Sequence, residues 1–435
     1  MRRPDKEHEL EATDPSPASL ASLPDEELIE LVQRQTFRLF WEDSHSRSGL
    51  APDGSPTRNH HVDDLVAVGG SGFGVMALIV AAERGWVTRE AALDRLGRML
   101  DSLIRATCYH GAYPHFMHGL TGATIPFTRK DDGGDLVETS FLCMGLLCAR
   151  QYFQRDDVLE KAVRDRITWI WEEVEWSWYT RDGRELLYWH WSPNNGWAMN
   201  LEIRGWNECL ITYVLAAASR RYPIEPIVYH HGFAAGRNFL NGRRYYDIEL
   251  PLGPDFGGPL FFAHYSFCGL DPRGLKDRYA DYWQQNVRHV QINRAHCIAN
   301  PNAHKGYGAS CWGLTASDDP DGYAAHAPAL DNGTISPTAA LSSLPYAPRE
   351  VMQTLRHFLS EYRTRVWGRY GFFDAFCEGR DWYARSYLSI DQGPIIVMME
   401  NHRTGLLWKL FMNVPEVQAG LRRLGFTSPY LDGTN

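Results

Sequence analysis

The chain has 435 residues, of which 44% are hydrophobic and 22% are charged. This balance is that of a globular protein with a large core, and it excludes a disordered or collagen-like chain. The formal net charge of −9 argues against nucleic acid as a partner. No apolar run approaches the ~20 residues that a membrane-spanning helix needs, so we expect no membrane partner.

The polar start of the chain predicts a short lead followed by one domain. Residues 1–21 combine several acidic residues with Pro15 and Pro17, a composition typical of disorder. We expect a disordered lead over 1–21 and a single catalytic domain over 22–435. Because the lead has no apolar centre, the sequence as it stands predicts a cytoplasmic protein, or a periplasmic one if a leader has been removed.

Two kinds of helix are predicted in alternation along the chain. A first helix starts at Pro24, with acidic residues in its first turn. Amphipathic patterns that cover a core occupy residues 88–105, 157–175, 347–365 and 403–424. Segments that are apolar nearly all round occupy residues 72–83, 136–151, 209–218, 335–343 and 393–400. A ring of inner helices surrounded by outer ones produces this alternation, so we predict an all-α fold, an α/α toroid of six helix pairs.

Strand signals are sparse, and the segments between helices are long. Residues 184–191 and 244–250 are predicted to form short β-hairpins. The stretch 288–334 has no helical period and is rich in Gly, Asp, His and Asn. A long ordered loop in a compact domain is usually functional, so we expect this stretch to serve the function.

Aromatic residues are frequent, at 13% of the chain. Most of the rings must fill the core, but Trp189, Trp191 and Trp197 stand in segments rich in Gly, Pro and Asn. Flat rings in loops suit the flat apolar faces of sugars, because an aromatic side chain presents a large apolar surface. The composition therefore favours carbohydrate binding.

Other site types find little support. The eight cysteines are scattered with no C-x-x-C pair, which predicts buried free thiols. The histidines lack zinc spacing, so we expect no metal. The segment 69–74 is rich in glycine but lacks the strand and lysine of a phosphate cradle. We expect it to let an inner helix start close to its neighbours.

Acidic residues stand where loops enter the buried helices. Asp131 and Asp135 precede one such helix, and Glu138 lies three residues after Asp135, on the same helix face. Asp135 and Glu138 also fit a capping box, in which both would serve only the helix start. Asp391 stands before the buried helix at 393–400.

Glu208 enters a buried helix as a lone acid after Trp206 and Asn207. Burying a carboxyl is costly unless it is paired or its pKa is raised, which favours a functional role for Glu208. Asn207 can be a plain N-cap. A further acidic run at 317–322 resembles a calcium loop only loosely and is predicted to be a solvated turn.

Two chemistries compete for these acids. Asp131 to Asp135 matches the D-D-x-x-D pattern that binds magnesium in helical isoprenoid enzymes, but Gly133 and Gly134 oppose the helix that this pattern needs. Paired carboxylates among aromatic loops fit glycoside hydrolysis better. One acid protonates the leaving oxygen, and the other activates water or attacks the sugar. Burial at the start of an apolar helix would hold one acid protonated near neutral pH.

Matching segments of a known family run in order from about residue 26 to 425: 36–41, 131–141, 191–197, 205–208, 262–267, 271–279, 312–318, 370–376, 391–394 and 400–409. They resemble the bacterial glucoamylase-like family that includes the β-1,2-glucanases of glycoside hydrolase family 144. The resemblance implies an (α/α)6 barrel with short β-hairpins and long loops around a cleft at one end. It also implies inverting hydrolysis of β-1,2-linked glucan, by endo action and without metal or cofactor.

By resemblance, the family's important acids fall on Asp131, Asp135, Glu138, Glu208 and Asp391. We expect Glu208 to be the general acid, because its setting best raises a pKa. Asp135 or Glu138 would handle the water, and Asp391 would orient substrate or help as base. The substrate-binding residues expected are Trp312, His264, Tyr265, Trp197, Trp206, Asn207 and Arg403.

The sequence leaves other functions open. Cyclic β-1,2-glucan synthases contain a related domain that transfers chains with retention, so a transglycosylase is one alternative. An exo-acting glucosidase of another linkage is a second, and a non-catalytic glucan-binding protein on the same barrel is a third. An isoprenoid cyclase would require magnesium. The turn at 218–223 departs from the family pattern, and the oligomeric state is not predicted.

Overall fold

The computed structural model describes residues 20–55 and 64–431, which are mostly helical with short strands. The helices are α2 (Asp25–Glu42), α3 (Val68–Glu83), α4 (Arg89–Arg105), α5 (Leu136–Tyr152), α6 (Val158–Glu172), α7 (Leu210–Ala218), α8 (Tyr282–Ala299), α9 (Pro337–Ser342), α10 (Pro348–His357), α11 (Arg363–Val366), α12 (Ser389–Arg403), α13 (Leu406–Met412) and α14 (Pro415–Arg423). The strands are β1 (Gly54–Ser55), β2 (Leu65–Ala67), β3 (Phe116–His118), β4 (Thr124–Ile125), β5 (Gly134–Asp135), β6 (His190–Trp191), β7 (Leu240–Tyr245), β8 (Ile248–Leu252), β9 (Ala316–Asp319), β10 (Gly322–Ala325), β11 (Trp367–Gly368), β12 (Gly371–Phe372), β13 (Phe376–Cys377), β14 (Trp382–Tyr383) and β15 (Tyr387–Leu388).

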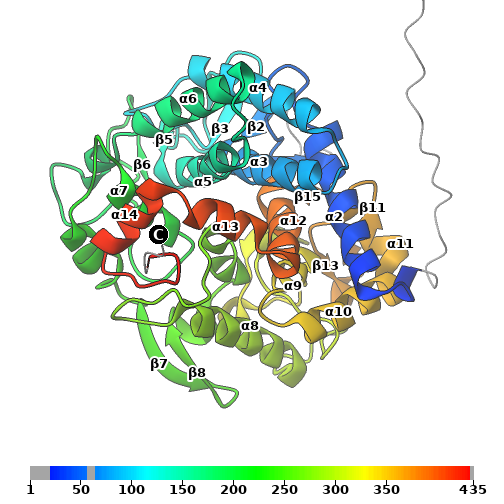
Figure 1. The fold of residues 1–435 in the computed structure, drawn as a ribbon. Helices are drawn as coiled ribbons and strands as arrows, with labels where there is room; N and C mark the ends of the chain where they lie inside the picture. Colours follow the sequence, from blue (N-terminus) through cyan, green and yellow to red (C-terminus); the bar gives the residue numbers. More distant parts are fainter. Residues whose placement is uncertain (1–19, 56–63, 432–435) are drawn as a thin grey trace, which may run out of the picture.

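The helices form an inner and an outer layer. α3, α5, α7 and α12 are buried along nearly their whole length, as their apolar sequences predict. Figure 1 shows α2, α4, α6, α8 and α10 at the periphery, with α3, α5 and α12 closer to the middle. The predicted alternation of buried and amphipathic helices is therefore confirmed for α3 to α7, α10 and α12, whereas α8 is not among the predicted helices.

Glycines bring two inner helices into close contact. A Cβ at Gly72 of α3 would lie 2.3 Å from the carbonyl oxygen of Phe141 in α5. A Cβ at Gly145 of α5 would lie 2.1 Å from the carbonyl oxygen of Gly72. Any larger residue at either position would force the helices apart, which confirms the role expected for the glycine-rich segment at the start of α3.

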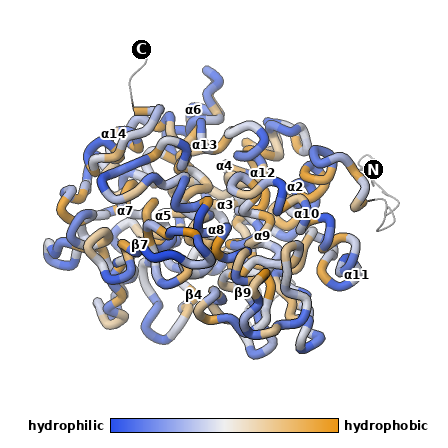
Figure 2. Tube along the Cα trace, turned by 90° about the horizontal axis from the view of Figure 1, so that it is seen from below, coloured by the Kyte–Doolittle hydropathy of each residue, from blue (hydrophilic) through white to orange (hydrophobic). Residues whose placement is uncertain are grey.

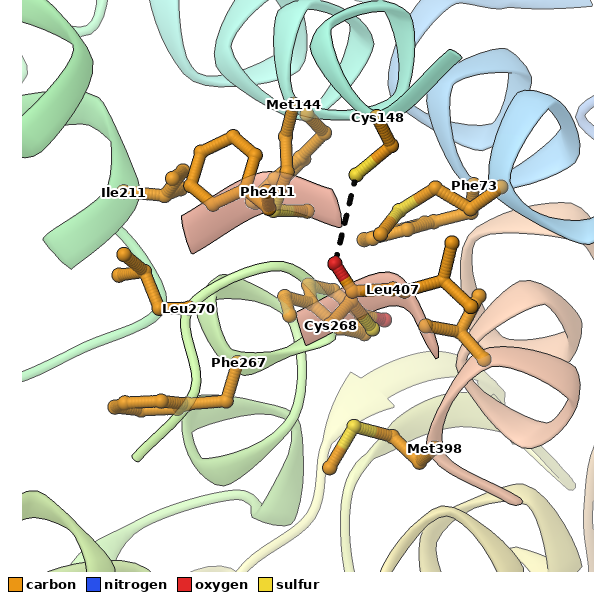
Figure 3. Packing of buried hydrophobic residues seen from close by; sticks show 14 of the residues in the cluster. Phe73, Met144, Cys148, Ile211, Phe267, Cys268, Leu270, Met398, Leu407 and Phe411 are labelled. Carbon is orange, nitrogen blue, oxygen red and sulfur yellow. Dashed lines mark hydrogen bonds between the residues drawn. The ribbon is translucent and has the colours of Figure 1, made fainter. Parts of the chain in front are cut away.

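Side chains fill the space between the inner helices. Figure 3 shows Phe73, Met144, Met398 and Phe411 arranged around Cys268 and Leu407. All of these side chains are buried. The eight cysteines are free thiols, and all except Cys108 are buried, largely as predicted. The interior between these helices is therefore a packed core.

The short strands lie at the end of the molecule where the inner helices begin. β2, β5 and β15 lead directly into α3, α5 and α12. Figure 2 shows β4 and β9 at one end and α13 and α14 near the opposite end. The loops at the strand end are therefore the ones that surround the first turns of the inner helices. Within the described residues, no helix is long and apolar enough to cross a membrane.

The stretch 288–334 is not the continuous loop that the sequence predicts, because α8 extends to Ala299. Polar side chains occupy its buried face, including Gln285, Asn286, His289 and Asn293, all 0% exposed. Gln285 bonds the backbone of Leu252, and Asn293 bonds that of Leu314. With polar groups on the buried face, the hydrophobic period of a helix disappears from the sequence.

Two predicted hairpins have different outcomes. β7 and β8 pair as an antiparallel hairpin, which confirms the one expected at 244–250. The segment 184–191 does not close on itself. Its last two residues form β6, which pairs with β5, so that His190 lies opposite Asp135.

Helix boundaries also differ from the predictions in places. The helix expected over 347–365 is interrupted by a π-helical turn at Phe358–Tyr362. The one expected over 403–424 is two helices, α13 and α14, with Pro415 at the start of the second. The predicted lead at 1–21 lies outside the described residues except for Leu20 and Ala21. Leu20 is buried, and the Ala21 carbonyl accepts a hydrogen bond from Arg356, so the packed chain begins at least two residues earlier than predicted.

Candidate active site

Four of the predicted carboxylates lie where the inner helices begin. Asp135 is the N-cap of α5, Glu138 lies in the first turn of α5, Glu208 precedes α7, and Asp391 lies in the first turn of α12. None of the four exposes more than 8% of its surface. Helix starts carry positive partial charge, which favours carboxylates at these positions.

Asp135 is a fully bonded carboxylate. Its Oδ1 accepts hydrogen bonds from the backbone N–H groups of Val137 and Glu138, both at 2.9 Å. Its Oδ2 accepts from the Trp189 indole at 3.0 Å and lies 3.3 Å from Nδ1 of His115. Asp135 is therefore held in place through both of its carboxylate oxygens.

Glu138 does not complete the capping box that the sequence allows. Its Oε2 accepts a hydrogen bond from the backbone N–H of Gly69 at 2.7 Å, across the interface between α5 and α3. The Asp135 N–H, which a capping box would bond to Glu138, instead donates to the Tyr113 carbonyl at 2.8 Å. Burial, with the neighbouring Asp135 charge, raises the pKa of Glu138 to about 7, although His115 opposes the shift.

His115 supplies a positive charge to this group. Burial opposes its protonation, but Glu138 and Asp135 raise the pKa of His115 to about 10. The imidazole is therefore a cation at neutral pH. Its ring stacks against Phe127, with 4.6 Å between the ring centroids, and Phe127 is 54% exposed.

Glu208 has the environment expected of a protonated carboxyl. Burial, helped by the charges of Glu138 and Asp135, raises the pKa of Glu208 to about 7. Among the residues that the structure describes, no cation contributes to this shift, in contrast to that of Glu138. The hydroxyl of Ser266 donates to the Glu208 carbonyl and accepts from the N–H of Ile211, which fixes the turn into α7. Asn207 caps this turn, since its Oδ1 accepts from the Cys209 N–H at 3.0 Å.

Asp391 is bonded to a buried tyrosine. The hydroxyl of Tyr265 donates to Asp391 Oδ1 at 2.6 Å. The Tyr265 ring packs against Phe73, Phe141 and Phe261, with centroid distances of 5.1 to 5.6 Å. Burial and the Asp391 charge hold the pKa of Tyr265 well above its usual value, so the hydroxyl keeps its proton.

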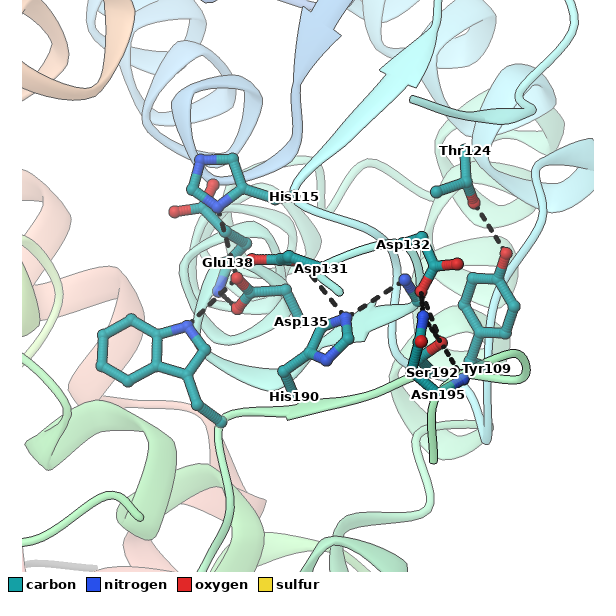
Figure 4. A network of polar contacts seen from close by, with 12 residues as sticks. Tyr109, His115, Thr124, Asp131, Asp132, Asp135, Glu138, His190, Ser192 and Asn195 are labelled. Atoms are coloured by element: carbon teal, nitrogen blue, oxygen red, sulfur yellow. Dashed lines mark hydrogen bonds and ion pairs between the residues drawn. The ribbon is translucent and has the colours of Figure 1, made fainter. Parts of the chain in front are cut away.

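Asp131 lies at the edge of the same group. Figure 4 shows Asp131 and Asp135 next to each other beside the His190 ring, whose Nε2 is 3.2 Å from Asp131 Oδ1. Burial and the Asp135 charge raise the pKa of Asp131. The adjacent Asp132 bonds the side chains of Asn194 and Asn195, which fastens the loop after β6 beside the carboxylates.

The predicted substrate-binding residues are widely scattered. Trp312 is 0% exposed, and Trp206 packs among Phe233, Phe239, Phe267 and Tyr282. His264 is buried 2.9 Å from the Ser343 hydroxyl, and burial lowers the pKa of His264 to about 3. Neither tryptophan ring is exposed for stacking on a sugar.

Arg403 lies away from the carboxylates. It occupies the last residue of α12, whereas Asp391 lies in the first turn. Its guanidinium pairs with Glu26 and Glu30 of α2, and Glu30 also neighbours Arg84. The structure does not bring Arg403 to the site.

Three residues of the site are not singled out by sequence reasoning as partners of the acids. These residues are His115 and Trp189, which contact Asp135, and His190, which contacts Asp131. The sequence draws attention to the segment 189–191 only through its aromatic rings. The pairing of β5 with β6 brings these residues together, and strands of two residues leave no period to read.

The arrangement suits acid–base chemistry. Two neighbouring carboxyls, Glu138 and Glu208, have a pKa of about 7, and the pKa of His115 is raised to about 10 beside them. Such groups can exchange protons with a substrate at neutral pH. Among the described residues there is no group of three or more His, Cys, Asp or Glu placed to hold a metal ion.

Comparison with known proteins identifies the family. A family model described as "Putative glucoamylase" matches residues 200–415. A Bacteroides uniformis protein of solved structure with the same description is 57% identical, with a TM-score of 0.92 over 94% of this chain and 100% of that one. The endo-β-1,2-glucanase of Chitinophaga pinensis, solved with sophorotriose and glucose, is 52% identical, with a TM-score of 0.92 over the same shares. The chain belongs to this glucoamylase-like family.

A curated relative comes from Parabacteroides distasonis. It is an exo β-1,2-glucooligosaccharide sophorohydrolase acting at the non-reducing end, and it is 43% identical over 95% of this chain. This chain spans 60% of the length of that relative. The family therefore contains relatives described as acting in both endo and exo modes.

Proposed function

We propose that this protein hydrolyses β-1,2-linked glucan by general acid–base catalysis. One observation carries the proposal: two buried carboxyls, Glu138 and Glu208, have a pKa of about 7 and influence each other at the start of α5 and α7. The relatives described as β-1,2-glucanase and sophorohydrolase give the substrate class. Uncharged glucan also suits a site dominated by carboxylates.

Glu208 is the proposed general acid. Its carboxyl is buried and has no cationic partner within the described part of the chain, so at neutral pH it retains its proton longest and can give it to the leaving glycosidic oxygen. Ser266 and Asn207 fix the backbone around it and thereby its direction.

Glu138 is the proposed general base. The Gly69 N–H and the His115 cation favour the ionised form of Glu138. Among the described residues, Glu208 has no corresponding cation. Asp135 is less suited to take a proton from water, because both of its oxygens already accept hydrogen bonds. Activation of water by one carboxylate, with protonation by another, gives inversion at the sugar carbon.

Asp391 and Asp131 complete the proposed site. Asp391, held by the Tyr265 hydroxyl, would accept hydrogen bonds from sugar hydroxyl groups and so orient the substrate. Asp131, held beside His190, would do the same at the other edge. Tyr265 thereby acts through Asp391 as a positioning residue.

We also infer that the fold is an (α/α)6 barrel within a single domain. The order of outer and inner elements supports six pairs when the short helices η2 (Val228–Phe233) and η5 (Ser266–Cys268) are counted as one of them. The pairs would be α2 with α3, α4 with α5, α6 with α7, η2 with η5, α8 with α9, and α10 with α12. The contacts of α3 with α5 and α12 support neighbouring positions in the ring.

The test is incubation of the protein with linear β-1,2-glucan while NMR follows the anomeric signals. Short β-1,2-oligosaccharides released first as the α-anomer support the proposal. Release of the β-anomer, or formation of longer or cyclic chains, would instead make the protein a retaining transglycosylase. Glu208→Gln should abolish hydrolysis without unfolding, whereas Glu249→Gln, an exposed carboxyl on β8, should leave the rate unchanged. Full activity of Glu208→Gln would exclude Glu208 as the general acid.

A further inference from the structure

A hollow separate from the carboxylates lies beside the short helix η1 (Trp176–Thr180). Its volume is about 260 Å³. It is lined by aromatic rings and polar groups: Glu175, Ser177, Trp178, Asp182, Gly183, Trp197 and Tyr222. Pockets for drug-sized ligands measure about 300–1,000 Å³, so this hollow suits a single sugar ring better than a whole oligosaccharide.

Trp178 is partly exposed, and neighbouring side chains hold its ring in place. It is 40% exposed. One face stacks on His110, with ring centroids 3.7 Å apart and an interplanar angle of 16°. His110 is itself held by Glu175, with 2.9 Å between Nδ1 and Oε2. A rigid ring with an open surface is the arrangement that binds an apolar sugar face at low cost in conformational entropy.

The chemistry of the lining indicates an uncharged ligand rich in hydroxyl groups. Glu175 and Asp182 offer acceptors for hydroxyl donors, and none of the lining residues is Lys or Arg. Two carboxylates without a lining cation would repel phosphate, sulfate or an acidic sugar. Aromatic rings combined with hydrogen-bond acceptors fit a neutral hexose unit.

The hollow and the carboxylates lie on opposite sides of one strand. Neighbouring residues of a strand point to opposite faces. In β6, His190 contacts Asp131 of the carboxylate group, whereas the Trp191 ring lies 6.1 Å from that of Trp178. The hollow is therefore separated from the carboxylate group by β6.

We propose that this hollow is a second carbohydrate-binding site, which holds a glucosyl unit of a neutral glucan chain away from the bond that is cleaved. The proposal rests on the proposed function for the identity of the glucan. Trp178 supplies the stacking surface, Trp197 bounds the hollow, and Asp182 accepts hydrogen bonds from the sugar. Long chains bind at both sites, while the shortest substrates reach only the carboxylates.

Trp178→Ala and Asp182→Asn test this proposal in the whole protein. Trp169 on α6 is 49% exposed and does not line the hollow, so Trp169→Ala is the matched control. The probes are linear β-1,2-glucan and a β-1,2-linked trisaccharide. The measured quantity is the ratio of kcat/KM on the polymer to kcat/KM on the trisaccharide. We expect Trp178→Ala to lower this ratio about threefold to tenfold through a raised KM, as the loss of one ring contact predicts.

A binding measurement separates this proposal from the proposed function. Calorimetry measures the affinity of three proteins for the polymer: Glu208→Gln alone, Glu208→Gln with Trp178→Ala, and Glu208→Gln with Trp169→Ala. This measurement needs no turnover. Weaker binding in the Trp178→Ala combination alone supports the second site, even if the wild-type protein fails to cleave the glucan. Equal affinity in all three proteins, or an unchanged kcat/KM ratio, would overturn the second site while leaving hydrolysis at the carboxylates intact.

Discussion

The carboxylate of Glu138 accepts a hydrogen bond from the backbone N–H of Gly69, with 2.7 Å between Oε2 and the nitrogen. The two residues belong to the first turns of neighbouring inner helices, α5 and α3. An N–H in the first turn of a helix has no partner within that helix, so the carboxylate satisfies a donor that burial would otherwise leave unpaired. One hydrogen bond thus holds the proposed base and joins two helix starts.

Gly69→Ala should displace Glu138 and reduce activity. A Cβ at position 69 would lie 2.5 Å from Glu138 Oε2, closer than atoms can approach, so the carboxylate must move or rotate. A misplaced catalytic group costs on the order of 100-fold in rate. We expect kcat on linear β-1,2-glucan to fall by about that factor, with a lower Tm as well.

Gly97→Ala is the control for this substitution. Gly97 lies within α4, and a Cβ there would meet no atom within 4 Å. Alanine is favoured over glycine inside a helix by about 0.5–1 kcal/mol, so this variant should keep its activity and gain stability. If Gly69→Ala retained wild-type kcat, the position of Glu138 against α3 would not matter for catalysis.

The sequence predicts the acids of the site because each stands at a boundary that can be read. Asp135, Glu208 and Asp391 each mark the point where a loop enters an apolar helix, and that change in pattern is visible in a single sequence. Their partners are not readable in this way. His115 and Trp189 reach Asp135 through strand pairs of two or three residues, which carry no period.

The burial of side chains differs from the sequence-based expectation in two opposite ways. Trp312 and Trp206 stand in segments typical of a sugar-binding family, yet their rings are part of the core. Conversely, α8 is not recognised as a helix, since buried Gln285 and Asn293 bond the backbones of loops and so replace the apolar face. Whether a ring or an amide is buried depends on contacts between segments far apart in the chain.

Glu208→Gln should stabilise the protein at alkaline pH. Burial raises the pKa of Glu208 from 4.5 in the unfolded chain to about 7 in the folded protein. The folded protein therefore holds a proton that the unfolded chain releases, and the free energy of unfolding falls as the pH rises from about 4.5 to 7. Because Gln cannot ionise, the free energy of unfolding of the variant does not fall in this way.

Thermal denaturation as a function of pH measures this effect. At pH 8 the variant should be more stable than the wild type by up to about 3 kcal/mol, while near pH 4 no such gain should remain. Glu249→Gln, which removes an exposed carboxyl, serves as the reference and should follow the wild type at both pH values. An equal gain or loss at pH 4 and pH 8 would mean that the Glu208 pKa is not raised by folding.

Tyr265→Phe should reduce activity with little change in packing. The substitution removes only the hydroxyl that donates to Asp391 Oδ1 at 2.6 Å, while the ring keeps its contacts with Phe73 and Phe141. A hydrogen bond to a charged group contributes about 1.5–3 kcal/mol, so kcat/KM should fall roughly 10- to 100-fold.

Tyr346→Phe is the matched control for Tyr265→Phe. The Tyr346 hydroxyl is also buried, and it donates to the Ala263 carbonyl and accepts from Asn286. Both variants should lose similar stability, but only Tyr265→Phe should lose activity. Equal activity losses in the two variants would assign Tyr265 to packing rather than to the positioning of Asp391.

His115→Gln should move the acid limb of the pH–activity profile to higher pH. The His115 cation opposes the burial that raises the pKa of Glu138, so its removal raises that pKa further. A general base works only when ionised, and an opposite charge at close range shifts a carboxyl by about one to three pH units. Activity should therefore fall more at pH 6 than at pH 8, and the acid limb should move by at least about one unit. His118→Gln changes a histidine on the adjoining strand β3 that pairs with Asp64, and it should leave the profile unchanged. If the acid limb stays in place in His115→Gln, the base that titrates there is a group other than Glu138.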